Sequence, residues 1–235
     1  MSTSRQSARW AGVFYIIATA APILTMPFVG FLGGGVAGEP IPDYLASVSE
    51  NETQVIIGVF IELIWALSVV GITATLYPIL KKHKEALALG FFSIRSIEAI
   101  CTIIGSIGLL TLLTLSQEFV QAGEPAAFHF QTVGSMVLAI RDWAFPIGSG
   151  LVWSLSAVIL NYLLIQKKLI PRWLSIWGLV GGALSFANYL PQFFGTNSVD
   201  ILFLPIGVQE MVFAVWLIVK GIRSSAIDSE PANSK

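Results

Sequence analysis

Arg95-Ser96-Ile97-Glu98 lies inside an apolar run that extends over about residues 87–115. A full cation and a full anion three residues apart share one face of a helix. Each charge costs about 2.5–3.5 kcal/mol at the centre of a membrane helix on the insertion scale. This face cannot turn towards lipid, so we expect it to point into a helical bundle or a wet cavity.

The overall composition is that of a membrane protein. Of the 235 residues, 55% are hydrophobic and 11% are charged, whereas a soluble domain carries about 25% charged residues. The net charge of −1 gives no support for nucleic-acid binding. Cys101 is the single cysteine of the sequence, so neither an intrachain disulfide nor a cysteine-built metal site can form. No cofactor is expected.

The apolar runs predict an all-α, polytopic membrane protein with six transmembrane helices in one domain, residues 1–223. Each run is long enough for the ~20 residues that a crossing requires. The predicted spans are about residues 10–32, 55–80, 87–115, 133–166, 173–194 and 200–220. The polar residues 224–235 are expected to form a disordered cytoplasmic tail.

Two segments of the sequence are not explained by a single straight transmembrane helix. The fourth run exceeds one straight crossing, so either its helix is tilted and kinked near Pro146, or residues 133–142 form a separate surface or re-entrant piece. Between the first two spans, Pro42 and Asp43 precede the apolar residues of a segment, 42–48, that is typical of a short helix on the membrane surface.

The basic residues define an orientation. With six spans, every Lys and Arg outside the apolar runs falls on one side, and only Arg95 and Arg141 lie within the runs. By the positive-inside rule both termini are cytoplasmic. We therefore expect a multi-pass protein of the cytoplasmic membrane in contact with membrane lipids. No feature of the sequence sets an oligomeric state.

Six ionisable residues inside the apolar runs form the predicted binding site. At a rise of about 1.5 Å per residue, all six can meet in one central band of the bundle. Four acids face two bases, so either some acids are protonated or the site accepts a cation. The predicted pairs are Arg141 with Glu62, and Arg95 with Asp142 or Glu210. The complete set is Glu62, Arg95, Glu98, Arg141, Asp142 and Glu210.

Intramembrane charge predicts that this site binds or conducts a small molecule or an ion. The alternative is a non-catalytic scaffold or accessory subunit in which the charges are paired struts that fix the helix register. An enzyme is not expected, because no catalytic motif is present: Gly148-Ser149-Gly150 lacks the G-x-S-x-G spacing. Two separate histidines, His83 and His129, do not make a metal site. An intramembrane enzyme that combines an acid with Ser149 or His129 is the third hypothesis.

Four short stretches, spread over nearly the whole chain, resemble the bacterial multi-pass membrane family catalogued as domain of unknown function 4386. The resemblance implies a membrane location and assigns no reaction. Arg141 and Glu62 are not matched to its pattern. The stretches are Ala8-Arg9-Trp10-Ala11-Gly12 with Tyr15, Arg95 with Glu98-Ala99, Leu169-Ile170-Pro171-Arg172-Trp173-Leu174 leading to Gly178, and Glu210 followed by Trp216-Leu217-Ile218-Val219-Lys220-Gly221.

Overall fold

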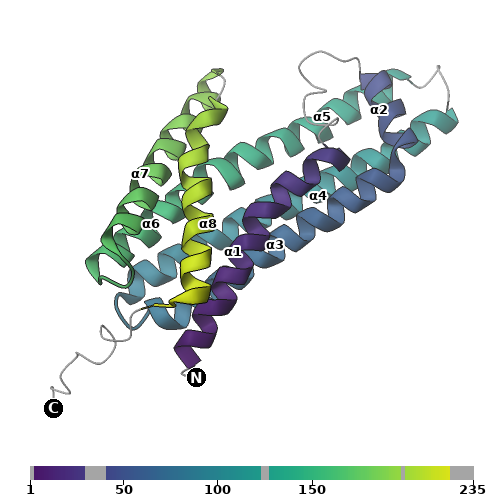
Figure 1. Cartoon of the computed structure of the whole chain (residues 1–235). Helices are drawn as coiled ribbons and strands as arrows, with labels where there is room; N and C mark the ends of the chain where they lie inside the picture. Colours follow the sequence, from purple (N-terminus) through teal and green to yellow (C-terminus); the bar gives the residue numbers. More distant parts are fainter. Residues whose placement is uncertain (1–2, 30–40, 123–126, 197–198, 223–235) are drawn as a thin grey trace.

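The computed structural model describes residues 3–29, 41–122, 127–196 and 199–222, and all regular secondary structure in these ranges is helical (Figure 1). The predicted all-α fold is therefore confirmed. In chain order the elements are α1 (Thr3–Val29), α2 (Ile41–Glu50), α3 (Glu52–Leu80), α4 (Glu85–Ala122), α5 (Ala127–Phe145), the π-helical segment η3 (Pro146–Val152), α6 (Trp153–Gln166), α7 (Arg172–Tyr189), the 3₁₀ turns η4 (Leu190–Phe194) and η5 (Asp200–Phe203), and α8 (Leu204–Val219).

Five helical stretches of the described chain are long and apolar enough to cross a membrane. They are α1, α3, α4, the continuous stretch from α5 through η3 to α6, and α8 with the turn before it. The chain is therefore a multi-pass membrane protein. The fifth predicted span corresponds to α7, which has 18 residues and is not among the five. The polar residues Arg172 and Asn188, together with the near-neutral Gly and Ser residues of α7, lower its hydropathy.

The helices form two groups that meet along α1 and α4. Helices α1, α3 and α4 run side by side as one long group, and α6, α7 and α8 form the second. Helix α8 packs on α1, and α6 packs on α4. Gly12 permits the first contact, because a Cβ atom there would lie 2.6 Å from the carbonyl oxygen of Ala214. Small residues allow such close backbone approach between membrane helices.

The buried face of α4 carries a polar band between two apolar layers. Ala88 and Phe91 belong to a core shared with α1, α3, α6, α7 and α8. Leu109 and Leu112 belong to a second core shared with α1, α2, α3 and α5. The opposite face of α4 exposes isoleucines to the surroundings. Between the two layers, the buried polar side chains of α4 are Arg95, Glu98, Thr102 and Ser106.

The structure decides between the two interpretations of the fourth apolar run. Helix is continuous from Ala127 to Gln166, so residues 133–142 are not a separate piece. The predicted kink at Pro146 takes the form of a π-helical segment that begins at this proline. Proline lacks the N–H that an α-helix needs at this point, and a wider turn accommodates it.

The short helix α2 is present, but its apolar face is buried against protein. Tyr44, Leu45 and Val48 are fully buried in the second apolar core. Their apolar face packs on α4 and α5 instead of lipid, because the second core offers protein contacts along the whole face. Residues 30–32 of the first predicted span and the predicted tail, residues 224–235, lie outside the described residues.

The close contact at Gly12 gives a stability prediction. Gly12→Ala should lower the free energy of unfolding by about 1–3 kcal/mol, as overpacking of a rigid contact does. Gly90→Ala is the matched control, because a Cβ atom at Gly90 meets nothing within 4 Å. Thermal unfolding in detergent measures both. Equal melting temperatures for the two variants would contradict the assigned α1–α8 contact.

Candidate functional site

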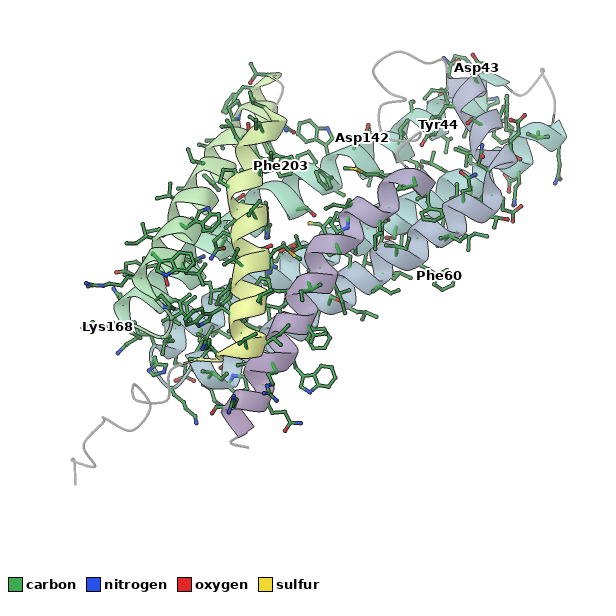
Figure 2. The ribbon with its side chains drawn as sticks, in the orientation of Figure 1. Asp43, Tyr44, Phe60, Asp142, Lys168 and Phe203 are labelled. Carbon is green, nitrogen blue, oxygen red and sulfur yellow. The ribbon has the colours of Figure 1, made fainter. Side chains whose placement is uncertain are left out.

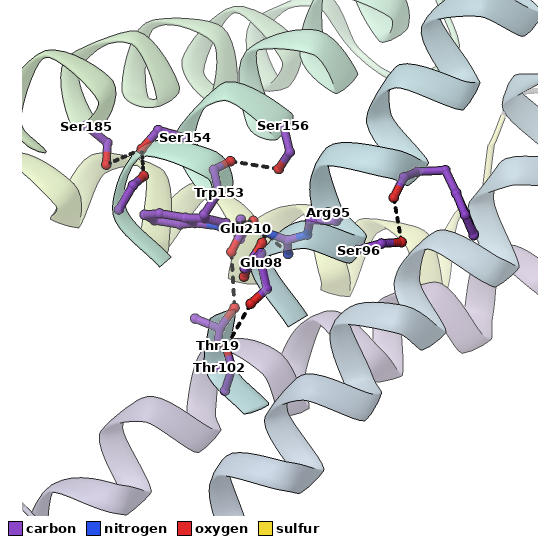
Figure 3. Close-up of polar contacts among 12 residues, drawn as sticks. Thr19, Arg95, Ser96, Glu98, Thr102, Trp153, Ser154, Ser156, Ser185 and Glu210 are labelled. Carbon is purple, nitrogen blue, oxygen red and sulfur yellow. Dashed lines mark hydrogen bonds and ion pairs between the residues drawn. The ribbon is translucent and has the colours of Figure 1, made fainter. Parts of the chain in front are cut away.

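Arg95 and Glu98 point into the protein, as the sequence predicted. They lie one turn apart on the buried face of α4, and each is 2% exposed. Arg95 Nη1 donates a hydrogen bond of 2.8 Å to Glu98 Oε2 (Figure 3). Ile97 and Ile100 on the same helix are exposed instead. The exposed face of α4 that carries these isoleucines therefore faces away from the bundle, and the charged pair faces into it.

Glu210 of α8 completes a group that we call the Arg95 cluster: Arg95, Glu98, Glu210, Thr19 and Trp153. Arg95 Nη2 lies 3.5 Å from Glu210 Oε1. Trp153 Nε1 donates a 2.9 Å hydrogen bond to the same oxygen. Thr19 Oγ1 lies 3.4 Å from Glu210 Oε2 (Figure 3). The cluster thus joins α1, α4, α6 and α8, which belong to both helix groups.

The aromatic ring of Tyr15 closes one side of this cluster. The guanidinium carbon of Arg95 lies 5.6 Å from the centre of the ring, within the range of a cation–π contact. Tyr15 is 2% exposed and packs edge-on against Phe213 of α8. The guanidinium is therefore shielded from lipid by α1.

Glu62 and Arg141 form a second, separate ion pair between α3 and α5. Arg141 Nη2 lies 2.7 Å from Glu62 Oε1, and Nη1 lies 3.3 Å from Oε2. Arg141 Nη1 also donates to the carbonyl oxygen of Gly105 at 2.9 Å. Ser106 Oγ donates to Glu62 Oε2 at 2.7 Å. This pair is bidentate, balanced in charge and held by two further hydrogen bonds, which is the strongest form of such a contact.

The hydroxyl groups of α4 occupy the space between the two charged groups. Thr102 Oγ1 donates to the carbonyl oxygen of Glu98, and Ser106 Oγ also contacts the carbonyl oxygen of Thr102, both at 3.1 Å. Residues 95, 98, 102 and 106 follow one helix face, a spacing that is visible in the sequence. The serine and threonine were not among the predicted residues, although this spacing would have found them.

The π-helical segment positions Trp153. Gly148 of this segment packs directly on the Cβ of Cys101 in α4, where a side chain would collide. Trp153 follows the segment immediately and reaches across to Glu210. Extra residues in one helical turn rotate the following side chains relative to the preceding ones. Sequence spacing alone gave no signal for Trp153 or Thr19, because both depend on how the helices pack.

The structure confirms the predicted pair Arg141–Glu62 and, of the two alternatives for Arg95, favours Glu210 over Asp142. The six residues do not all meet: five form the two groups, and Asp142 makes no hydrogen bond or ion pair with any residue that the structure describes. Asp142 follows Arg141 on α5 and therefore faces a different direction.

The first residues of α2 lie near this second pair. Burial raises the pKa of Tyr44 to about 12, even though the charge of Arg141 acts in the opposite direction. The phenol is therefore neutral at physiological pH and adds no charge to the balanced pair.

The proposed enzyme residues stand apart from the acids. Ser149 and His129 make no hydrogen bond to the charged residues within the described ranges, and His129 is exposed in the first turn of α5. These positions give the hypothesis of an intramembrane enzyme no support.

Two surface grooves lie on α4, and neither includes any of the six charged residues. One follows α4 from Ile107 to Glu118, and the other is lined by apolar residues that include Cys101 and Trp143. The side chains of Arg95, Glu98 and Glu210 are buried, so the Arg95 cluster is an interior site. Within the described ranges, no group of three or more His, Cys, Asp and Glu side chains is arranged to hold a metal ion.

The fold and the site define a helical multi-pass membrane protein with two buried ion-pair groups. A family model described as Domain of unknown function (DUF4386) matches residues 10–221, and the chain belongs to this family. The match includes the Arg95 cluster and the Glu62–Arg141 pair. No curated protein and no solved structure shows significant similarity to the chain.

The second ion pair gives a stability prediction. Glu62→Gln should cost about 3–5 kcal/mol, because it leaves the Arg141 charge buried without its partner. Glu62→Gln combined with Arg141→Gln should recover part of this loss, and the double-mutant cycle measures the coupling. Glu118→Gln, an exposed acid of α4, is the control and should change stability by less than about 0.5 kcal/mol. Additive effects of the two single variants would mean that the pair is not formed.

Proposed function

We propose that the protein binds or transports a small cation at the Arg95 cluster. The observation that carries this proposal is the charge count: two carboxylates, Glu98 and Glu210, share one guanidinium. All three groups are at most 8% exposed. An unbalanced negative charge in a low-dielectric interior is costly. A positive ligand removes that cost, so the cluster favours the cation-bound state.

The packing of the cluster supports an ion over a larger solute. Its charged side chains are at most 8% exposed and contact one another and Trp153 directly. A drug-sized ligand needs a cavity of several hundred Å³. The Glu62–Arg141 pair, by contrast, is balanced and has no charge left for a ligand.

We also propose that six helices cross the cytoplasmic membrane of a bacterium, with both termini in the cytoplasm and α7 as the additional span. The supporting observation is that the two ends of the described chain lie together. A Cβ atom on Gly221 would lie 3.8 Å from Arg5 Cγ. Lys168 lies towards this end of the molecule, and Asp43 lies at the opposite end (Figure 2). An even number of crossings and the positive-inside rule account for both facts.

The second candidate function is a membrane scaffold or accessory subunit. The bidentate Glu62–Arg141 contact favours it, because this pair connects α3 to α5 without an unused charge. In that case the Arg95 cluster would serve the same purpose for α4 and α8.

Ion flux in proteoliposomes distinguishes the two candidates. Glu98→Gln leaves one carboxylate, Glu210, for the one guanidinium and should abolish most of a cation- or proton-dependent flux, while Glu118→Gln should leave it unchanged. Flux is read with a dye inside the vesicles, and thermal unfolding shows whether each variant is folded. If the wild-type protein gives neither flux nor cation binding and Glu98→Gln is merely less stable, the scaffold is the correct assignment.

Thiol labelling tests the orientation. Asp43→Cys and Lys168→Cys are compared in a Cys101→Ser background, since both positions are exposed. A membrane-impermeant reagent added to intact cells should label the cysteine at position 43 and not the one at position 168. Labelling of both positions only after lysis, or the reverse pattern, would contradict the proposed topology.

A further inference from the structure

We infer that the cation is a proton and that Glu210, not Glu98, carries it in the resting state. This inference rests on the proposed function and names its ligand. It follows from how differently the two carboxylates contact Arg95, and from what else surrounds each of them.

Glu98 has the geometry of an ionised partner of Arg95. Its Oε2 atom receives the Arg95 Nη1 hydrogen bond at 2.8 Å, within the range of charge-assisted N–H···O contacts, about 2.7–2.9 Å. Glu210 lies further away, with 3.5 Å between its Oε1 atom and Arg95 Nη2. One guanidinium charge therefore compensates Glu98, and Glu210 is the surplus acid.

The neighbours of Glu210 fit a neutral carboxylic acid. Trp153 Nε1 can only donate, and it donates to Oε1 at 2.9 Å, which makes Oε1 the carbonyl oxygen. Oε2 faces the hydroxyl of Thr19 at 3.4 Å. A threonine oxygen accepts as well as donates, so a proton on Oε2 has a hydrogen-bond acceptor. Each oxygen thus has a partner suited to the acid form.

The charges around Glu210 favour a proton over a metal ion. The facing groups are Arg95 and Glu98 of α4, Tyr15 of α1 and Trp153 of α6. The guanidinium would repel a metal cation placed between the carboxylates. Oxygen-coordinated cations need about six or more oxygen ligands, and the partners that contact Glu210 are mostly nitrogen donors. A proton requires a single oxygen.

An unused donor of Arg95 indicates how the proton leaves. Arg95 is 2% exposed, and its Nε–H has no acceptor among the described residues. A buried donor of this kind is commonly satisfied by a water molecule. Release then breaks the O–H bond of Glu210, leaves the electron pair on the carboxylate and transfers the proton to water. The cluster is left with one net negative charge, which favours reloading.

Infrared spectroscopy of the purified protein tests this assignment without a flux measurement. The wild-type protein should show a C=O stretching band of a protonated carboxyl group near neutral pH. Glu210→Gln should remove the band. Thr19→Val keeps the carboxyl and should shift the band to higher frequency, because the hydrogen bond at Oε2 is lost. If Glu210→Gln does not fold, the frequency shift in Thr19→Val tests whether Glu210 carries the proton.

Thr102→Val is the matched control, since the Thr102 hydroxyl bonds the backbone of Glu98 and does not contact Glu210. It should leave the band in place. A band that keeps its frequency in folded Thr19→Val would mean that the protonated carboxyl is not Glu210 and would overturn the inference. The inference would also be overturned if the folded wild-type protein showed no such band, or if the band disappeared when sodium replaced potassium in the buffer. If flux is observed without the carboxyl band, the assignment of the proton to Glu210 is wrong but transport stands. If the band is observed without flux, only the proposed transport is wrong.

Discussion

The contact between Arg95 and two carboxylates is the constraint that organises this protein. A buried guanidinium requires a counter-charge, and Glu98 on the same helix provides one at 2.8 Å. Glu210 adds a second from α8, so α4 and α8 are connected through the cluster. Lipid cannot solvate any of these groups. The charged face of α4 must therefore turn inwards, and the two helix groups meet where the charges lie.

The sequence predicted side-chain contacts where few chemically suitable partners exist. Charged residues in apolar runs have few possible partners, so approximate depth predicted the Glu62–Arg141 pair, and left Arg95 with Asp142 or Glu210. The contacts of Trp153 and Thr19 did not follow, because they depend on the π-helical segment and on interhelical distances. The burial of α2 against protein did not follow for a related reason. An apolar face is equally suited to lipid and to a protein core, and only the packing distinguishes them.

The Arg95 cluster and the Glu62–Arg141 pair differ in how completely their charges are compensated. Arg141 uses both terminal nitrogens on Glu62 and one of them on a backbone carbonyl, so the pair is bidentate and balanced in charge. Arg95 shares its charge between two acids, and its Nε donor has no acceptor among the described residues. A balanced pair fixes geometry, whereas a cluster with a surplus acid can change its protonation or its partners. The same helix α4 carries both, with hydroxyl groups between them.

The length of α4 has a consequence for the shape of the protein in the bilayer. Its 38 residues correspond to about 57 Å at about 1.5 Å per residue, against a hydrocarbon thickness of about 30 Å. Even at a tilt of about 40°, the upper end of the usual range, it would extend roughly 44 Å along the membrane normal. Part of α4 must then lie outside the hydrocarbon core, in the headgroup region or beyond it. If this part includes the end near Glu118, then α2, which packs on α4, meets polar headgroups and water there and not acyl chains.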